Sequence, residues 1–135
     1  MAIMWTEMLS VGVEQIDKQH RELFEHANRL FEAGQKGKSK EVIGELLQFL
    51  DQYTKTHFRD EEKYMESIKY PELDVQKRAH ADFIASLQNL RNEFEKSGGN
   101  LTVVLNANRL VVDWLTNHIA NQDKKIGKYA KSVGK

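Results

Sequence analysis

Apolar residues recur every three or four positions in four separate segments of the chain, which is the pattern of amphipathic helices. The first segment covers residues 17–34, with Asp17 as its expected N-cap. Ser39 can cap the second segment, and Pro71 breaks the chain between the second and the third. A polar, glycine-rich turn at residues 97–100 precedes the fourth. The pattern therefore predicts four helices with short connections.

Such helices pack as an all-α, up-down-up-down antiparallel four-helix bundle. The chain of 135 residues is long enough for one domain with a real core, so we assign residues 1–135 to a single domain. Within it, residues 1–16 form an N-terminal arm, residues 17–122 the bundle, and residues 123–135 a short tail. The tail is expected to hold one more helical piece around Lys124 to Lys131.

Polar residues interrupt the apolar stripes at one end of the predicted bundle. They are His20, His57, Glu61, Gln76, His80 and His118. His57 and Glu61 are four residues apart and therefore share one face of a helix. In an antiparallel bundle, the starts of the first and third helices meet the ends of the second and fourth. All six side chains are thus expected in one layer of the core.

A buried layer of four imidazoles and a carboxylate has many donors and acceptors to satisfy without water. A metal ion satisfies them together. Imidazole and carboxylate ligands without sulfur suit iron, manganese or zinc. A carboxylate among several imidazoles can also bridge two ions, as in two-metal sites generally.

Asp123 is a candidate second bridge. It follows His118 by five residues, which on a regular helix places it about 140° away around the axis. Both side chains can face the site only if the helix unwinds or ends near residues 120–122, and we predict that distortion. On spacing alone, Asp123 is equally well a solvated residue of the tail. His26 lies about 120° from His20 and is expected to be a surface histidine, not a ligand.

Composition narrows the function classes. The 20 basic and 20 acidic side chains give no net charge, which argues against a nucleic-acid or anionic-membrane partner. The absence of cysteine excludes disulfides, iron–sulfur clusters, thiolate zinc sites and cysteine nucleophiles. Residues 1–10 lack the basic cluster of a signal peptide, and no apolar run reaches the ~20 residues of a membrane span. A cytoplasmic location is expected.

Four segments, spread over nearly the whole chain, carry a more specific signal. They run from Val11-Gly12-Val13 to His20, from His57-Phe58 to Met65, from Tyr70-Pro71 to Phe83, and from Trp114-Leu115 to Asp123. In order and spacing they resemble the bacterial hemerythrins, or hemerythrin-like domains. The resemblance implies a non-haem di-iron centre with an oxo or hydroxo bridge, in which Glu61 and Asp123 are the bridging carboxylates.

The resemblance also implies a role for each histidine. His20 and His57 would hold the iron with an open position, where dioxygen binds, and His80 and His118 would hold the other iron. The family's apolar oxygen pocket matches Leu23, Phe58, Trp114, Leu115 and Ile119. Plain core packing explains Trp114 and Leu115 equally well.

Gln76 departs from the family pattern, in which the third helix carries two histidines four residues apart. The second matches His80 and the first falls at Gln76. Its amide oxygen can bind iron as a weaker ligand, or the position can be left to water or empty. An open position there could admit peroxide or another small substrate.

The leading functional hypothesis is reversible binding of dioxygen, for storage, delivery or sensing, by a protein that is not an enzyme. A signalling protein is the expected partner if the chain is a domain of a larger receptor. The alternative is a di-iron oxidase or peroxidase that uses the position freed at Gln76. A metal-storage or nitric-oxide-responsive protein, or a bundle whose polar layer binds nothing, are further hypotheses.

Overall fold

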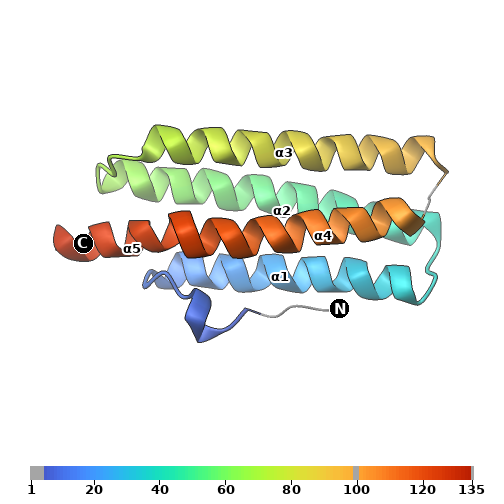
Figure 1. The fold of residues 1–135 in the computed structure, drawn as a ribbon, viewed down its shortest axis with the longest axis horizontal. Coiled ribbons are helices and arrows are strands. Elements are labelled where there is room, and N and C mark those ends of the chain that lie inside the picture. The colour runs from blue at the N-terminus through green and yellow to red at the C-terminus, as the bar shows by residue number, and fades with distance from the viewer. Residues whose placement is uncertain (1–4, 99–100, 135) are drawn as a thin grey trace.

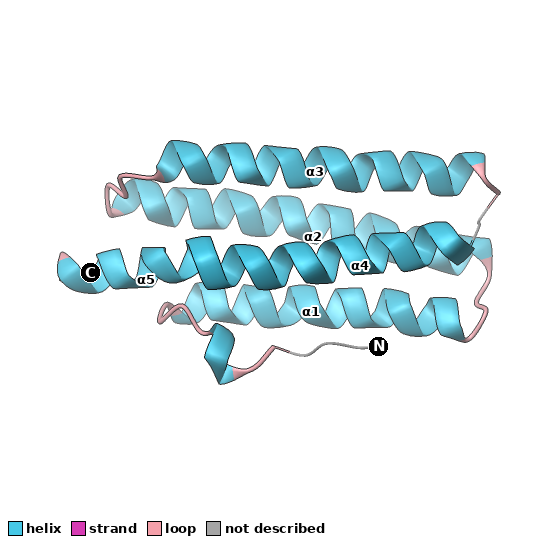
Figure 2. Ribbon diagram, viewed as in Figure 1, coloured by secondary structure: helices cyan, strands magenta, loops and turns pink. Residues whose placement is uncertain are grey.

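The structure is a computed structural model that describes residues 5–98 and 101–134. Its main elements are four long helices: α1 (Glu14–Gln35), α2 (Lys40–Ser67), α3 (Leu73–Lys96) and α4 (Leu101–His118). They lie side by side with alternating direction, α1 packing against α2 and α4, and α3 against the same two (Figure 1). The described residues form helices and loops without any strand (Figure 2). The predicted all-α antiparallel bundle is confirmed.

The inward stripes of the four helices form one continuous apolar core. Leu30, Leu50 and Leu87, from three different helices, are completely buried along its length. Of the turn expected at residues 97–100, positions 99–100 lie outside the described residues. No helix in the described ranges combines the length and the apolarity that a membrane span requires.

The start of α1 differs from the prediction. The helix begins at Glu14, and Val13 is its N-cap, so the assignment of Asp17 as N-cap is wrong. Asp17 is instead buried in the first turn, where its carboxylate accepts hydrogen bonds from the Ser10 hydroxyl (2.6 Å) and the Val11 amide (2.8 Å). Asp17 thus holds the arm on the helix. The Ser39 cap of α2 is confirmed, because its side chain accepts from the amide of Val42.

The predicted distortion after His118 is also confirmed. Residues Ile119–Asp123 form a π-helical segment, which widens the turn so that residues five apart come to the same side. The chain then continues as α5 (Lys124–Ser132), the expected helical piece of the tail, whose Ile126 side chain is buried. The π segment therefore brings Asp123 onto the face of the helix that carries His118.

The packing of α5 on the arm predicts a strong effect at Gly127. A β-carbon there would lie 1.6 Å from the backbone oxygen of Val11, so the arm would have to move. We expect Gly127→Ala to lower the free energy of unfolding by about 1–3 kcal/mol, as overpacking does. Gly44→Ala is the control, because its β-carbon would meet only the Phe94 ring at 4.0 Å. Chemical denaturation should show that the Gly44→Ala control is as stable as the wild type or more stable. Equal stability of the Gly127→Ala variant and the wild type would contradict the tight contact.

Candidate metal centre

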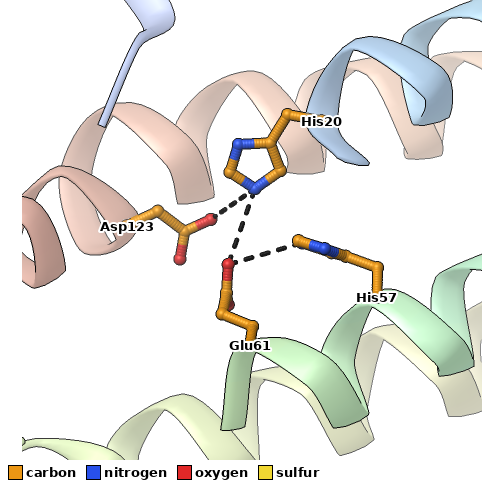
Figure 3. Close-up of side chains that lie close together, drawn as sticks. All are labelled: His20, His57, Glu61 and Asp123. Carbon is orange, nitrogen blue, oxygen red and sulfur yellow. Dashed lines mark ion pairs between the residues drawn. The ribbon is translucent and has the colours of Figure 1, made fainter. Parts of the chain in front are cut away.

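Two groups of four buried side chains meet at one end of the bundle. In the first, His20, His57, Glu61 and Asp123 each bring one ligand atom to within 4.8 Å of the others (Figure 3). In the second, Glu61, His80, His118 and Asp123 do the same. The two carboxylates belong to both groups, so the arrangement suits two metal ions that share two ligands.

Every helix of the bundle contributes to this layer. α1 provides His20, α2 provides His57 and Glu61, α3 provides Gln76 and His80, α4 provides His118, and the π segment provides Asp123. All seven side chains are buried. The structure thus brings together every residue that the sequence placed in the layer.

Glu61 lies between the two pairs of histidines. Its Oε2 atom lies 3.4 Å from Nε2 of His57 and 3.6 Å from Nε2 of His20. Its Oε1 atom lies 3.0 Å from Nε2 of His80. Each carboxylate oxygen therefore points to a different pair, as a bridging ligand requires.

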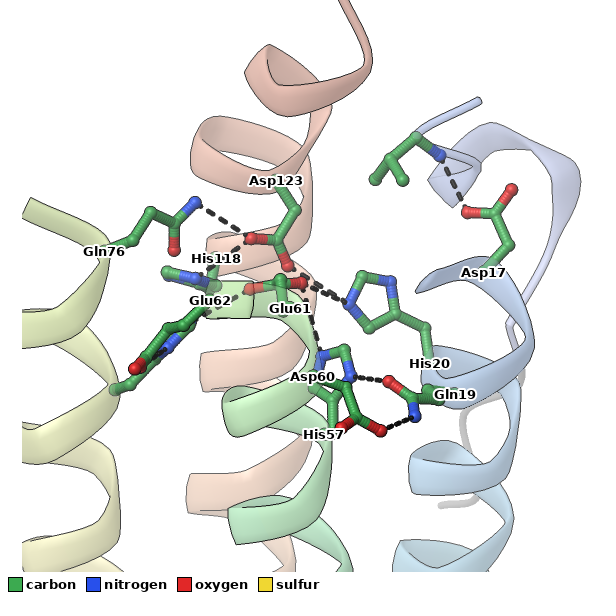
Figure 4. Close-up of polar contacts among 12 residues, drawn as sticks. Asp17, Gln19, His20, His57, Asp60, Glu61, Glu62, Gln76, His118 and Asp123 are labelled. Atoms are coloured by element: carbon green, nitrogen blue, oxygen red, sulfur yellow. Dashed lines mark hydrogen bonds and ion pairs between the residues drawn. The ribbon is translucent and has the colours of Figure 1, made fainter. Parts of the chain in front are cut away.

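Asp123 repeats this arrangement from the opposite side of the layer. Its Oδ2 atom lies 3.1 Å from Nε2 of His20, and its Oδ1 atom lies 3.1 Å from Nε2 of His118 (Figure 4). The π segment makes this possible, because a regular helix would turn Asp123 away from His118. The placement decides between the two interpretations of Asp123: it is part of the layer, not a solvated tail residue.

Several atoms of the layer are buried without a hydrogen bond to any described residue. They include both ring nitrogens of His20, Nε2 of His80 and His118, and both carboxylate oxygens of Glu61. An unsatisfied buried polar group costs about 1–3 kcal/mol, more if it is charged. The nitrogen and oxygen lone pairs of these side chains point toward the same space, and such lone pairs bind cations. The residues present therefore fit a pair of metal ions.

The layer strongly favours charge on its carboxylates. Burial acts to raise the pKa of Glu61, but the neighbouring histidines, His57 above all, hold that pKa well below its usual value. Burial and the charge of Glu61 act to raise the pKa of Asp123, yet His118 and His20 keep it lowered. Burial opposes the charged form of His20, but Asp123 and Glu61 raise its pKa to about 9. Without metal, a proton on His20 offsets part of the negative charge.

Residues outside the layer orient two of the imidazoles. Nδ1 of His57 lies 2.7 Å from the amide oxygen of Gln19, whose NH2 group donates to Asp60 at 2.9 Å (Figure 4). Asp60 thereby fixes the Gln19 amide so that its oxygen accepts from His57. Nδ1 of His80 likewise lies 2.8 Å from a carboxylate oxygen of Glu62. In each imidazole the proton sits on Nδ1, which leaves the Nε2 lone pair facing the layer.

The roles of these three supporting residues were not predicted from the sequence. Gln19 and Glu62 each stand directly beside a residue of the layer, and Asp60 directly before Glu61. The one feature of the sequence that could have indicated them is their position directly beside a candidate metal ligand. Position alone does not show which histidine such a side chain contacts.

Gln76 lies at the edge of the layer and contacts Asp123. Its Nε2 donates a hydrogen bond to Oδ1 of Asp123 at 3.1 Å. Its amide oxygen is buried and makes no hydrogen bond with the described residues. Gln76 therefore holds the shared carboxylate, and the second group has two imidazoles, as the first has.

Aromatic rings cover the second pair of histidines. Phe58 stacks on His80 with ring centroids 3.8 Å apart, and Trp114 stacks on His118 at 4.2 Å. The other expected pocket residues, Leu23, Leu115 and Ile119, are buried. His26 belongs to neither group and is half-buried, not the surface histidine that was expected, with its ring centroid 5.2 Å from that of Tyr53.

The contact of Glu62 with His80 predicts an effect on metal affinity. We expect Glu62→Gln to weaken metal binding by about 10–100-fold, because the carboxylate orients the imidazole and raises its basicity. Glu66→Gln is the matched control, since Glu66 lies four residues on and, among the described residues, forms an ion pair with the exposed Lys77 alone. Metal titration with a competing chelator measures both variants. Equal affinities in the two would show that Glu62 does not support the centre.

Comparison with known proteins identifies the group to which this centre belongs. The family described as "Hemerythrin HHE cation binding domain" matches residues 11–130. The chain belongs to the hemerythrin family. A bacteriohemerythrin of Stenotrophomonas maltophilia is 32% identical over 130 residues, which are 96% of this chain and 82% of that protein. A bacteriohemerythrin of Pseudomonas aeruginosa is 35% identical over 121 residues, 90% of this chain and 76% of that one.

Two further relatives extend the hemerythrin assignment. A myohemerythrin of Theromyzon tessulatum is 29% identical over 121 residues, covering 90% of this chain and 88% of its own. A crystal structure of a point mutant, 30% identical in sequence, superposes with a TM-score of 0.83 and covers 95% of this chain and 97% of its own. The hemerythrin match includes the arm from Val11 onward and α5 up to Ala130, as well as the four helices of the bundle.

Proposed function

We propose that this hemerythrin binds dioxygen reversibly at a non-haem di-iron centre, for oxygen storage and delivery or for sensing. The observation that carries the proposal is the pair of carboxylates, Glu61 and Asp123, each offering one oxygen to each pair of histidines. His20 and His57 would hold one iron, and His80 and His118 the other. The relatives named bacteriohemerythrin and myohemerythrin support this function.

The two iron ions, when bound, supply the redox chemistry that dioxygen binding needs. The protein's own part is to position and to shield. Gln19 and Glu62 keep two imidazoles in the tautomer that presents Nε2 to a metal. Phe58 and Trp114 place apolar rings against the layer, which excludes water and slows the loss of bound oxygen in a reduced form. The oxygen pocket and the cytoplasmic location stay predictions of the sequence.

An optical spectrum of the reduced, iron-loaded protein before and after admission of air tests the proposal. Reversible binding predicts a visible charge-transfer band that appears with air and disappears on removal of oxygen. Metal analysis of the same sample should find two irons per chain. Direct conversion to an oxidised spectrum, without that band, would overturn the carrier function and favour redox sensing or catalysis.

A second candidate function is that of a di-iron oxidase or peroxidase. One observation favours it: His80 and His118 are the only imidazoles of the second group, and Gln76 points its NH2 group at Asp123. An iron held by His80 and His118 would then accept a small substrate such as peroxide. Turnover with a reductant, under conditions in which a carrier consumes no oxygen, distinguishes the two functions.

Replacement of Gln76 tests this second candidate. We expect Gln76→His to add a third imidazole to the second iron, to slow autoxidation and to lower peroxidase turnover by about tenfold or more. Gln76→Leu is the control, because it removes the hydrogen bond to Asp123 without adding a ligand. Stopped-flow spectroscopy follows all three proteins. Spectra and autoxidation rates that do not change in the histidine variant would show that position 76 leaves the metal unaffected.

A further inference from the structure

A cavity of about 440 Å³ opens to solvent at the same end of the bundle as the buried metal layer, and none of the metal-layer side chains lines it. It lies between the N-terminal arm (residues 10–13), Tyr64 near the end of α2, and one face of α5, elements that Figure 1 shows at the same end of the molecule. This volume accommodates a small organic or inorganic ion with some of its water. Neither the family match nor the proposed oxygen chemistry assigns it a role.

The charge of this cavity is one-sided. Lys124, Lys128 and Lys131 line it, at spacings of four and three residues that place them on one face of α5. No aspartate or glutamate is among the lining residues. In the described part of the chain, none of the three ammonium groups has a carboxylate within 4.0 Å, whereas the neighbouring Lys125 reaches Glu72. Like charges one turn apart repel each other, and an anion between them would relieve that repulsion.

Two acidic groups adjoin residues that line the cavity, and neither neutralises these lysines. Asp17 lies beneath the arm, and its two oxygens accept from the Ser10 hydroxyl and the Val11 amide. Asp123 is buried and directs both oxygens to histidines of the metal layer. The cationic face of α5 therefore borders the cavity with no carboxylate among the lining residues.

We propose that this cavity, bounded by Lys124, Lys128 and Lys131, binds a small anion that carries a phosphate or a carboxylate group. The lysine ammonium groups supply charge-assisted hydrogen bonds, and the hydroxyl of Tyr64 supplies a further donor on the wall. Backbone of the arm closes one side, held by the contact of Gly127 with Val11. The recognised feature is negative charge on oxygen, which phosphates and carboxylates share.

Such an anion would also affect the metal layer. Lys124 directly follows Asp123, and Asp17, which holds the arm, precedes His20 by one helical turn. An anion in the cavity therefore fastens the arm and α5 to each other, next to two residues of the layer. Because coupling between two sites is reciprocal, anion binding and metal affinity should influence each other.

Isothermal titration of the metal-loaded protein at low ionic strength tests the proposal, with inorganic phosphate and succinate as probes. We expect one site per chain for at least one probe, and the ratio of the two affinities identifies the preferred group. The variant Lys128→Gln/Lys131→Gln should bind about tenfold more weakly. The matched control is Lys36→Gln/Lys38→Gln, which removes the same charge at the opposite end of the bundle and should bind like the wild type.

Lysine acylation with mass-spectrometric readout locates the bound probe. A saturating anion should protect Lys124 and Lys128, while Lys125 on the same helix stays reactive. Three results would overturn the proposal: no saturable binding of either probe, equal loss of affinity in both double variants, or equal protection of all lysines. None of these results measures oxygen binding, so a failure here leaves the dioxygen function untouched.

Discussion

Glu61→Gln is expected to abolish tight metal binding at both groups of ligands in the metal centre. Glu61 gives one oxygen to the pair His20 and His57 and the other to His80. An amide keeps the shape but replaces one of these oxygens by an NH2 group, which has no lone pair for a metal. The change also removes a negative charge that lies completely buried. Since loss of a supporting residue alone costs about 10–100-fold in affinity, loss of a shared ligand should exceed about 100-fold.

Metal content after gel filtration, with circular dichroism for the fold, measures this expectation. The wild type should hold two ions per chain and the Glu61→Gln variant close to none, with its helical content kept. Glu62→Gln is the most stringent control, because it makes the same chemical change one residue away and should weaken binding without abolishing it. Two tightly bound ions in the Glu61→Gln variant would show that this carboxylate is not the bridge.

The sequence predicted the layer because two simple rules suffice for it. Helical periodicity puts His57 and Glu61 on one face, and the antiparallel arrangement puts the ends of α2 and α4 beside the starts of α1 and α3. The distortion before Asp123 followed from geometry as well. In a regular α-helix, two residues five apart do not lie on the same face. The structure brings His118 and Asp123 to one face through the π segment.

Other features depend on contacts between distant segments, which no local rule specifies. Asp17 has the sequence pattern of an N-cap. In the structure, however, its carboxylate accepts a hydrogen bond from the amide of Val11 in the arm, and α1 begins before it, at Glu14. Gln19 reaches His57 only because α1 and α2 pack in one particular register. The donor direction of Gln76 depends likewise on where the π segment places Asp123.

Removal of the metal is expected to destabilise the bundle by several kcal/mol. The buried histidine nitrogens and Glu61 oxygens lose the metal as a partner and make no hydrogen bond with the described residues, and each unsatisfied group costs about 1–3 kcal/mol. For a domain of 135 residues, that loss lowers the melting temperature by more than about 10 °C. Thermal unfolding with and without a chelator measures the difference, and returning iron should restore it.

The difference in stability between the metal-loaded and the metal-free protein should depend on pH. In the metal-free protein, a proton on His20 supplies part of the positive charge that the metal otherwise provides. In the metal-free protein the pKa of His20 rises from 6.5 to about 9. A raised pKa stabilises the folded state fully below 6.5, and this contribution is lost as the pH rises to about 9. The lowered pKa values of Glu61 and Asp123 act in the opposite sense, so their contribution is lost as the pH falls into the acid range.

The metal-loaded protein has no such proton to lose, so the two stability curves should separate as the pH rises. Between pH 6.5 and 9 we expect the gap in unfolding free energy to widen by about 3 kcal/mol, the linkage value of that pKa shift. Chemical denaturation of both forms across this range measures the gap. His26→Gln should leave the widening unchanged, because His26 lies outside the layer. A gap that stays constant would mean that His20 does not hold the proton that the metal displaces.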